Sequence, residues 1–329
     1  MTRIQMKLKA IASAAVAVPL LVSCGGGSDN IVKLNGAGAT FPAALYQAWF
    51  GRYSQATGNR INYQAVGSGA GVRQYNAKTI DFGASDAAVM KPQVPVVQIP
   101  VTGGAIVPAY NNKGCDAKIT QTQLADVFMG KINNWSEFGC EDKKILVVYR
   151  ADGSGTTKGF TNSLSAFSSE WKEKLGTAKS VKWPVGIGAK GNAGVAAQVI
   201  QQDGAIGYMN YDYSRNPKLT QVKLQNKAGN FVTANATTSS EGLSRIKLDD
   251  KLRGTNANPD GANSYPIVSL TWILAYPESR TGVKDMLRYV LSEESQAISD
   301  SLGFVPLPED LRQKSLNAVE AITEPSTGA

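Results

Sequence analysis

Apolar residues follow helical spacing in some stretches of the chain and strand spacing in others. Over residues 42–55 they recur four positions apart, at Leu45, Trp49 and Tyr53, which predicts a helix with one buried face. Residues 60–66 alternate between apolar and polar types, as in a half-buried strand. A glycine-rich loop at 67–71 leads into a predicted helix that ends at 77. The same criteria predict further helices over 121–129, 156–165, 193–202, 283–302 and 308–322. They also predict strands over 80–84, 145–149 and 204–210.

Three stretches do not fit either pattern simply. Residues 94–110 form a long apolar run that Gly103–Gly104 interrupts, and residues 265–276 form a second apolar run. Residues 237–259 are polar and poor in pattern, so we expect irregular surface structure there. Over the rest of the chain, helical and strand-like segments alternate without an internal repeat, which predicts an α/β protein.

The first 23 residues have the composition of an export signal. Residues 1–9 carry three basic residues and no acidic one, and residues 10–22 are apolar but too few for a stable membrane span. The sequence Leu-Val-Ser-Cys24 follows, and then a glycine-rich stretch to residue 30. This resembles the lipobox of bacterial lipoproteins, which implies cleavage before Cys24, a lipid on its sulfur and a flexible tether over 24–30. The alternative is an ordinary signal peptide with an incidental cysteine.

Composition limits the chemistry that the chain can perform. It has 329 residues, which suits two domains better than one, and it contains no histidine, which excludes Ser-His-Asp and Cys-His nucleophile systems and HExxH zinc sites. Three cysteines are too few for a four-thiolate zinc site, and we expect no metal and no cofactor. Cleavage after residue 23 would lower the net charge from +8 to +5, and no basic run is interleaved with aromatics, so nucleic acid is not an expected partner.

Cys115 and Cys140 are the two cysteines that remain if Cys24 carries a lipid. Export would place them in a compartment that can be oxidising, where a disulfide between them would stabilise the fold by about 3 kcal/mol. The alternative is a pair of free, buried thiols.

Three loops place small or hydroxyl residues where a predicted helix begins. They are Thr40–Phe41, Gly67–Ser68 and the Asp-Gly-Ser-Gly-Thr sequence of residues 152–156. The first turn of a helix has unpaired N–H groups and the positive end of the helix dipole, and glycine lets a ligand approach the backbone closely, so such loops can bind an oxyanion. The alternative for each loop is simple helix capping, since Ser, Thr and Asp are common N-caps.

Charged residues near these loops support anion binding. Arg150 ends a predicted buried strand and offers a forked, permanently charged donor, which Asp152 could hold in place. Asp86 follows another predicted strand and could accept a hydrogen bond from an anion that carries a proton, while repelling a fully ionised one. Its alternative role is the N-cap of a helix after Ser85.

At these loops the chain resembles the phosphate-binding proteins of bacterial high-affinity phosphate ABC transporters. The resemblance extends in order from about Gly36 to Tyr213 and is looser in the C-terminal third. The motifs that carry it are Gly-Ala-Gly-Ala-Thr-Phe-Pro42, Tyr-Gln-Ala-Val-Gly-Ser-Gly69, Asp-Phe-Gly-Ala-Ser-Asp86, Gly-Lys-Ile-Asn-Asn-Trp135, Arg-Ala-Asp-Gly-Ser-Gly-Thr156, Lys-Trp-Pro184, Lys-Gly-Asn192 and Gly-Ala-Ile-Gly-Tyr208.

The resemblance implies a site and a fold. The implied phosphate contacts are Thr40, Phe41 (through its backbone N–H), Ser68, Asp86, Arg150, Ser154, Gly155 and Thr156. The implied architecture is the two-lobed α/β fold of type II periplasmic binding proteins, with mixed sheets flanked by helices and phosphate in the cleft between the lobes. One lobe would comprise 31–104 plus 266–329 and the other 105–265, with the apolar runs near Gly103 and Tyr265 crossing between them.

The implied function is phosphate import. An exported, lipid-anchored monomer would deliver phosphate to a membrane ABC permease powered by separate ATPase subunits, with no chemistry of its own. A phosphatase or phosphotransferase would need a nucleophile or a metal, and Ser154 has no adjacent base. A phosphate sensor without a transport role is the third possibility.

Gly186, Gly188 and Gly191 fit a dinucleotide motif, but Pro184 makes the preceding segment a poor central strand, so we expect no dinucleotide site.

Overall fold

The structure is a computed structural model that describes residues 31–325. The expected signal peptide (1–23), the candidate lipidation site Cys24 and the expected tether (24–30) lie outside the described residues. The helices are α1 (Ala43–Thr57), α2 (Ser68–Asn76), α3 (Gln121–Phe128), α4 (Gly155–Phe167), α5 (Ser169–Lys174), α6 (Gly191–Gln201), α7 (Tyr211–Ser214), α8 (Ala236–Ser244), α9 (Val283–Val290), α10 (Glu293–Ser301), α11 (Glu309–Glu320) and the short 3₁₀ helix η1 (Trp135–Phe138). The strands are β1 (Lys33–Gly38), β2 (Arg60–Ala65), β3 (Phe82–Ser85), β4 (Val97–Asn111), β5 (Lys118–Ile119), β6 (Leu146–Arg150), β7 (Ile187–Ala189), β8 (Ala205–Asn210), β9 (Thr220–Gln221), β10 (Lys223–Gln225), β11 (Phe231–Val232) and β12 (Val268–Ala275).

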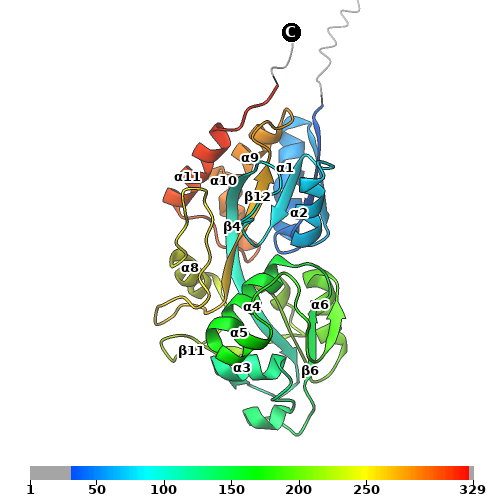
Figure 1. The fold of residues 1–329 in the computed structure, drawn as a ribbon, viewed down its shortest axis with the longest axis vertical. Helices are drawn as coiled ribbons and strands as arrows, with labels where there is room; N and C mark the ends of the chain where they lie inside the picture. Colours follow the sequence, from blue (N-terminus) through cyan, green and yellow to red (C-terminus); the bar gives the residue numbers. More distant parts are fainter. Residues whose placement is uncertain (1–30, 326–329) are drawn as a thin grey trace, which may run out of the picture. The chain divides into compact units, whose positions relative to one another are not determined.

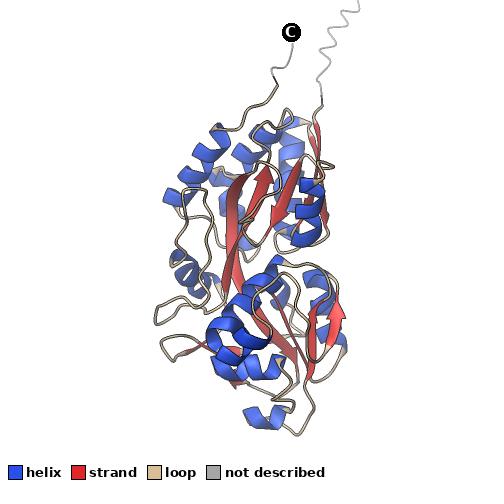
Figure 2. Cartoon of the chain, in the orientation of Figure 1, coloured by secondary structure: helices blue, strands red, loops and turns tan. Residues whose placement is uncertain are grey.

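Most strands join one mixed sheet in the order β2-β1-β3-β12-β4-β8-β6-β7, with β9 also paired to β4. Figure 2 shows the strands in red and the helices around them in blue. β1 runs parallel to β2 and β3, and β6 runs parallel to β7 and β8, whereas β12 is antiparallel to both of its neighbours. Helices cover the sheet, with α2 on β1 and β3, α6 on β6 and β8, and α11 on β4. The expected α/β class with mixed sheets is therefore confirmed.

Strand β4 belongs to two sets of partners. Its residues 97–105 pair with β12, and its residues 106–111 pair with β8. We call β2, β1, β3, β12 and residues 97–105 the first half-sheet, and residues 106–111 with β8, β6, β7 and β9 the second half-sheet. Figure 1 shows β4 running from one half-sheet into the other.

The glycines that were expected to interrupt this apolar run lie within the continuous strand β4. Their role is packing. A Cβ atom on Gly103 would lie 2.8 Å from Leu243 Cδ1, and one on Gly104 would lie 2.9 Å from the ring of Phe41. A side chain at either position would therefore push α8 or the loop before α1 away from the sheet.

Four of the five tryptophans are fully or almost fully buried, and each of these indole N–H groups has a backbone partner. Trp49 donates to the Ser295 carbonyl at 2.7 Å and Trp272 to the Leu252 carbonyl at 2.8 Å, while Trp135 and Trp171 donate in the same way. They fill the core and satisfy their polar atom there, so they are unavailable as stacking platforms.

Two secondary-structure predictions were wrong. Residues 236–244 form helix α8 rather than irregular structure, because Asn235 and Thr238 make a reciprocal capping box and Leu243 supplies a buried anchor. The single helix expected over 283–302 is divided into α9 and α10, because Ser292 caps the Ser295 N–H and starts a new helix. The rest of the stretch, residues 245–259, is irregular, as expected.

Cys115 and Cys140 form a disulfide, with their Cα atoms 5.2 Å apart. The bridge joins the segment after β4 to the loop after η1, across 25 residues of sequence. The expected disulfide is therefore present, and the alternative of two free thiols is wrong for this structure.

Replacing both cysteines, as Cys115→Ser with Cys140→Ser, should lower the free energy of unfolding by about 3 kcal/mol, because the unfolded chain regains the entropy of an open loop. Urea unfolding of the variant and of wild type checks this. Wild type unfolded in the presence of a reductant should match the variant, and an unchanged unfolding midpoint in both cases would contradict the prediction.

Candidate functional site

The residues that the sequence singled out lie at the carboxyl ends of strands. Thr40 and Ser68 follow β1 and β2, Asp86 follows β3, and Arg150 is the last residue of β6. Ligands of open α/β sheets collect at such ends. The start of α4 reaches the same place, because a Cβ atom on Gly155 would lie 2.6 Å from Ser68 Oγ and 2.8 Å from Asp86 Cβ. The site therefore combines loops of the first half-sheet with loops of the second.

Two of the helices that begin here offer backbone donors with no protein partner. Within residues 31–325, the N–H groups of Thr40 and Phe41 before α1, and of Gly155 and Thr156 at the start of α4, make no hydrogen bond. Unpaired N–H groups at the positive end of a helix dipole attract an anion.

Side-chain capping explains only one of the three loops. Ser154 Oγ accepts the N–H of Thr157 at 3.0 Å and caps α4. Neither α1 nor α2 has a side-chain cap, so Thr40 and Ser68 do not serve that purpose. The capping alternative therefore holds for Ser154 and is wrong for the other two hydroxyls.

Arg150 and Asp152 form a buried, two-pronged ion pair. Arg150 is 2% exposed, and its Nε and Nη2 atoms donate to Asp152 Oδ1 at 2.8 Å and Oδ2 at 2.6 Å. Its Nη1 atom lies 3.4 Å from Thr156 Oγ1. Burial opposes ionisation of Asp152, but the hydrogen bonds from Arg150 outweigh it and hold the pKa of Asp152 below its ordinary value. Asp152 thus fixes the guanidinium, as the sequence suggested.

Asp86 is a carboxylate with almost no solvent contact. It is 3% exposed, its Oδ1 accepts the Thr271 hydroxyl at 2.8 Å, and its Oδ2 lies 3.5 Å from Ser68 Oγ and 3.4 Å from Thr156 Oγ1. Burial raises its pKa from 3.8 to about 6, against the opposing effects of the Thr271 hydrogen bond and Arg150. No helix follows it before β4, so the N-cap alternative for Asp86 is wrong.

Lys179 adds positive charge beside this carboxylate. Its Nζ lies 3.5 Å from Ser85 Oγ, and its backbone carbonyl accepts the Ser154 N–H at 2.9 Å. Burial, together with the charge of Lys158, lowers its pKa to about 8. No pattern in the sequence marked this lysine.

Four further residues contact the predicted site and were assigned no role from the sequence. Asn192 donates to Thr40 Oγ1 at 3.0 Å, and Tyr213 donates to the Thr40 carbonyl at 2.8 Å. Asn210 accepts the Thr156 hydroxyl at 3.0 Å, and Thr271 binds Asp86. Asn192 lies inside a motif shared with the resembling family, which was the one available signal. Asn210 lies in a predicted strand, Thr271 in an apolar run and Tyr213 in a segment with no predicted element.

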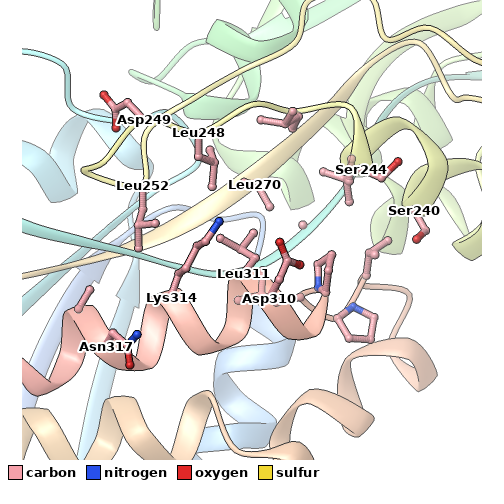
Figure 3. A pocket seen from close by; sticks show the side chains of 18 of the residues that line it. Ser240, Ser244, Leu248, Asp249, Leu252, Leu270, Asp310, Leu311, Lys314 and Asn317 are labelled. Atoms are coloured by element: carbon pink, nitrogen blue, oxygen red, sulfur yellow. The ribbon is translucent and has the colours of Figure 1, made fainter.

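Among the cavities that adjoin the sheet, two are relevant to the site. One, of about 210 Å³, lies beside Asp86 and is lined by Lys158, Gly159 and Ser269 among others. The other, of about 660 Å³, lies between α8 and α11, where Leu252, Leu270 and Leu311 are part of its wall (Figure 3). None of the predicted phosphate-contact residues lines this second cavity, so it is separate from the anion site.

Within residues 31–325, no group of three or more Cys, Asp or Glu side chains is arranged to hold a metal ion. In the same part of the chain, no helix has the length and apolar character needed to cross a bilayer.

Comparisons with known proteins agree with this geometry. Residues 25–294 match the family model described as the PBP superfamily domain. The phosphate-binding protein PstS of Pasteurella multocida is 40% identical over 304 residues, which cover 85% of this chain and 88% of that protein. PstS of Haemophilus influenzae is 38% identical over 301 residues, covering 85% and 90%. The chain belongs to the PstS family.

A solved member of the same fold gives the architecture. The phosphate-binding protein from Stenotrophomonas maltophilia shares 19% identity and superposes with a TM-score of 0.69, covering 87% of this chain and 93% of that one. The fold is therefore that of type II periplasmic binding proteins, as the PstS resemblance implied.

The raised pKa of Asp86 predicts a pH effect on stability. Between about pH 3.8 and 6 the folded protein keeps a proton that the unfolded chain releases, so the free energy of unfolding falls as pH rises through this window. Asp86→Asn removes the ionisation and should gain stability over wild type by up to roughly 3 kcal/mol at neutral pH, with little gain near pH 4. Urea unfolding in phosphate-free buffer at the two pH values measures the difference. The exposed Asp300→Asn is the control, and a gain that is independent of pH would count against the assigned ionisation.

Proposed function

We propose that this protein binds one inorganic phosphate ion at the Asp86–Arg150 site and delivers it to a membrane ABC permease. One observation carries the proposal: a buried carboxylate is surrounded by a buried guanidinium and by unpaired backbone donors. Donors alone would suit any oxyanion. A carboxylate among them requires an anion that brings its own proton, as phosphate does at neutral pH and sulfate does not.

Each predicted residue has a stated part in this proposal. The N–H groups of Thr40, Phe41, Gly155 and Thr156 and the hydroxyls of Thr40, Ser68 and Ser154 donate to phosphate oxygens. Arg150, held by Asp152, supplies the charged donor. Asp86 accepts the hydrogen of a phosphate hydroxyl.

We further propose that residues 31–104 with 266–329 form one lobe and residues 105–265 the other. The exchange of partners along β4 supports this boundary, because pairing changes from β12 to β8 between residues 105 and 106. Phosphate touches both lobes, so binding favours the form in which they are closed around it. We expect the protein to be a monomer and the permease to recognise the closed form.

The protein carries out no chemical step of its own, since its relatives are binding proteins. Transport therefore depends on partners: permease subunits and separate ATPase subunits. A role as a phosphate sensor would use the same site, and the loss of phosphate uptake in cells that lack the protein distinguishes transport from sensing.

Titration calorimetry of the mature protein should show one phosphate bound per chain at micromolar Kd or tighter, about −8 kcal/mol or stronger. Sulfate should bind far more weakly. In Asp86→Asn the phosphate affinity should fall by roughly 5- to 150-fold, because a charge-assisted hydrogen bond is lost, while sulfate should gain as repulsion is removed.

The control for this titration is Asp300→Asn, measured at the same pH and ionic strength. If wild type gives no binding heat and no melting shift at millimolar phosphate, the proposed function is wrong. If the phosphate-to-sulfate ratio in Asp86→Asn stays within about threefold of wild type, selectivity must come from the donors instead.

Export and lipid anchoring are also proposals, which rest on residues 1–30 of the sequence. Cys24→Ala should move the protein from the membrane fraction to the soluble fraction, because it removes the sulfur that would carry the lipid. Detergent-phase partition and intact mass of both forms measure this. Equal membrane association of wild type and variant would argue that Cys24 is not an anchor.

A further inference from the structure

Two tyrosines hold consecutive carbonyl groups of the loop before α1. Tyr63 in β2 donates from its hydroxyl to the Ala39 carbonyl at 2.7 Å. Tyr213 in α7 donates from its hydroxyl to the Thr40 carbonyl at 2.8 Å. The loop is thus held on two successive peptide units by one tyrosine from each of the two proposed lobes. The Thr40 carbonyl also accepts the Ala43 N–H, at a longer 3.4 Å.

A peptide unit that is held by its carbonyl has a fixed N–H direction. The unit is planar and trans, so its C=O and the next residue's N–H point in opposite directions. Holding the Ala39 carbonyl therefore sets the direction of the Thr40 N–H, and holding the Thr40 carbonyl sets that of the Phe41 N–H. Both N–H groups are without a partner within residues 31–325.

The hydroxyl of Thr40 is oriented by Asn192, which lies in the same proposed lobe as Tyr213. The backbone N–H and the side-chain Nδ2 of Asn192 both donate to Thr40 Oγ1, at 3.2 Å and 3.0 Å. A hydroxyl oxygen has two acceptor positions, and when both are used its own proton must point elsewhere. Asn192 is fully buried, so this arrangement is not in competition with water.

We propose that Tyr213 is a positioning residue that aims the Phe41 N–H at the bound anion as the lobes close, with Asn192 turning the Thr40 hydroxyl proton the same way. This rests on the proposed phosphate site. The donors of the first lobe are completed by contacts from the second, so an open protein has an incomplete set of donors. Closure of the lobes and alignment of the protein's donors to the ligand therefore occur together.

The chemistry of Tyr213 suits this role. Burial raises the pKa of Tyr213 above its ordinary value, and Asp212 adds to the shift, so its hydroxyl remains a neutral donor at working pH. A hydrogen bond accepted by a carbonyl also polarises its peptide unit and strengthens the N–H at the other end.

The test uses three substitutions that each remove one hydroxyl. Tyr213→Phe removes the bond to Thr40, and Tyr63→Phe removes the matching bond to Ala39 within one lobe. Tyr211→Phe is the control, because Tyr211 lies in the same short helix and its hydroxyl makes no hydrogen bond within the described residues. Inorganic phosphate is the probe, and amide chemical shifts of Thr40 and Phe41 are followed by NMR during the titration, together with the affinity and the unliganded unfolding temperature.

Wild type and Tyr211→Phe should bind phosphate equally and show large phosphate-induced shifts at both amides. Tyr213→Phe should bind roughly 2- to 10-fold more weakly, the size of one net hydrogen bond, with the shift reduced at Phe41 and retained at Thr40. Tyr63→Phe should show the reverse pattern.

Failure of wild type to bind phosphate would overturn the proposed function itself. Binding by wild type with Tyr213→Phe identical to Tyr211→Phe would overturn only the positioning role. Weaker binding by Tyr213→Phe with an unchanged Phe41 shift, or with a lower unliganded unfolding temperature that accounts for the loss, would mean that the hydroxyl is merely structural.

Discussion

Burial of the Asp86 carboxylate is the constraint on which the site depends. A charged group removed from water needs hydrogen bonds and nearby opposite charge, or it takes up a proton. Here the compensation comes from the Thr271 hydroxyl, two further hydroxyls and the positive charge of Arg150 and Lys179. It is incomplete, since burial still raises the pKa of Asp86 to about 6. A ligand that donates one more hydrogen bond to this carboxylate therefore stabilises its charged form.

The ion pair of Arg150 and Asp152 compensates a buried positive charge in the same way. A lone buried guanidinium would be costly and would attract any anion strongly. With Asp152 bound through two hydrogen bonds, its charge is largely balanced and its orientation is fixed. In the proposed site, an anion is then attracted by the remaining Arg150 donor and by helix N-termini, whose N–H groups are directional. Directional donors recognise the shape of a ligand and the position of its protons, which charge alone does not.

Strand β4 links this chemistry to the fold. Because it pairs with β12 along one part and with β8 along the next, loops from both half-sheets meet where their strands end. Several donors are then held by residues from the opposite half, as Tyr213 and Asn192 hold Thr40. A site built in this way is complete only when both halves are in place, which suits a protein that must bind a ligand and later release it.

The sequence by itself determined the local features of this protein. Helical spacing identified α1, and a short β-branched run identified β6, because these signals arise from neighbours along the chain. Glycine and hydroxyl residues before helices indicated the loops that we propose bind the anion. The motifs in order were enough to indicate the family and its fold. A cysteine pair left over after Cys24 was enough to suggest the disulfide that the structure contains.

Only the tertiary structure decided which residues complete the site. Asn192 and Tyr213 reach Thr40 across 152 and 173 residues of sequence, and Thr271 reaches Asp86 across 185. Neighbouring residues do not reveal the distant partner of any of these three side chains. The family motif around Asn192 was the only local signal among them. The raised pKa of Asp86 has the same origin, since it depends on how many elements close over one carboxylate. The residues of each loop determine which hydrogen-bond donors it can offer. The contacts that orient those donors form only once distant strands have paired.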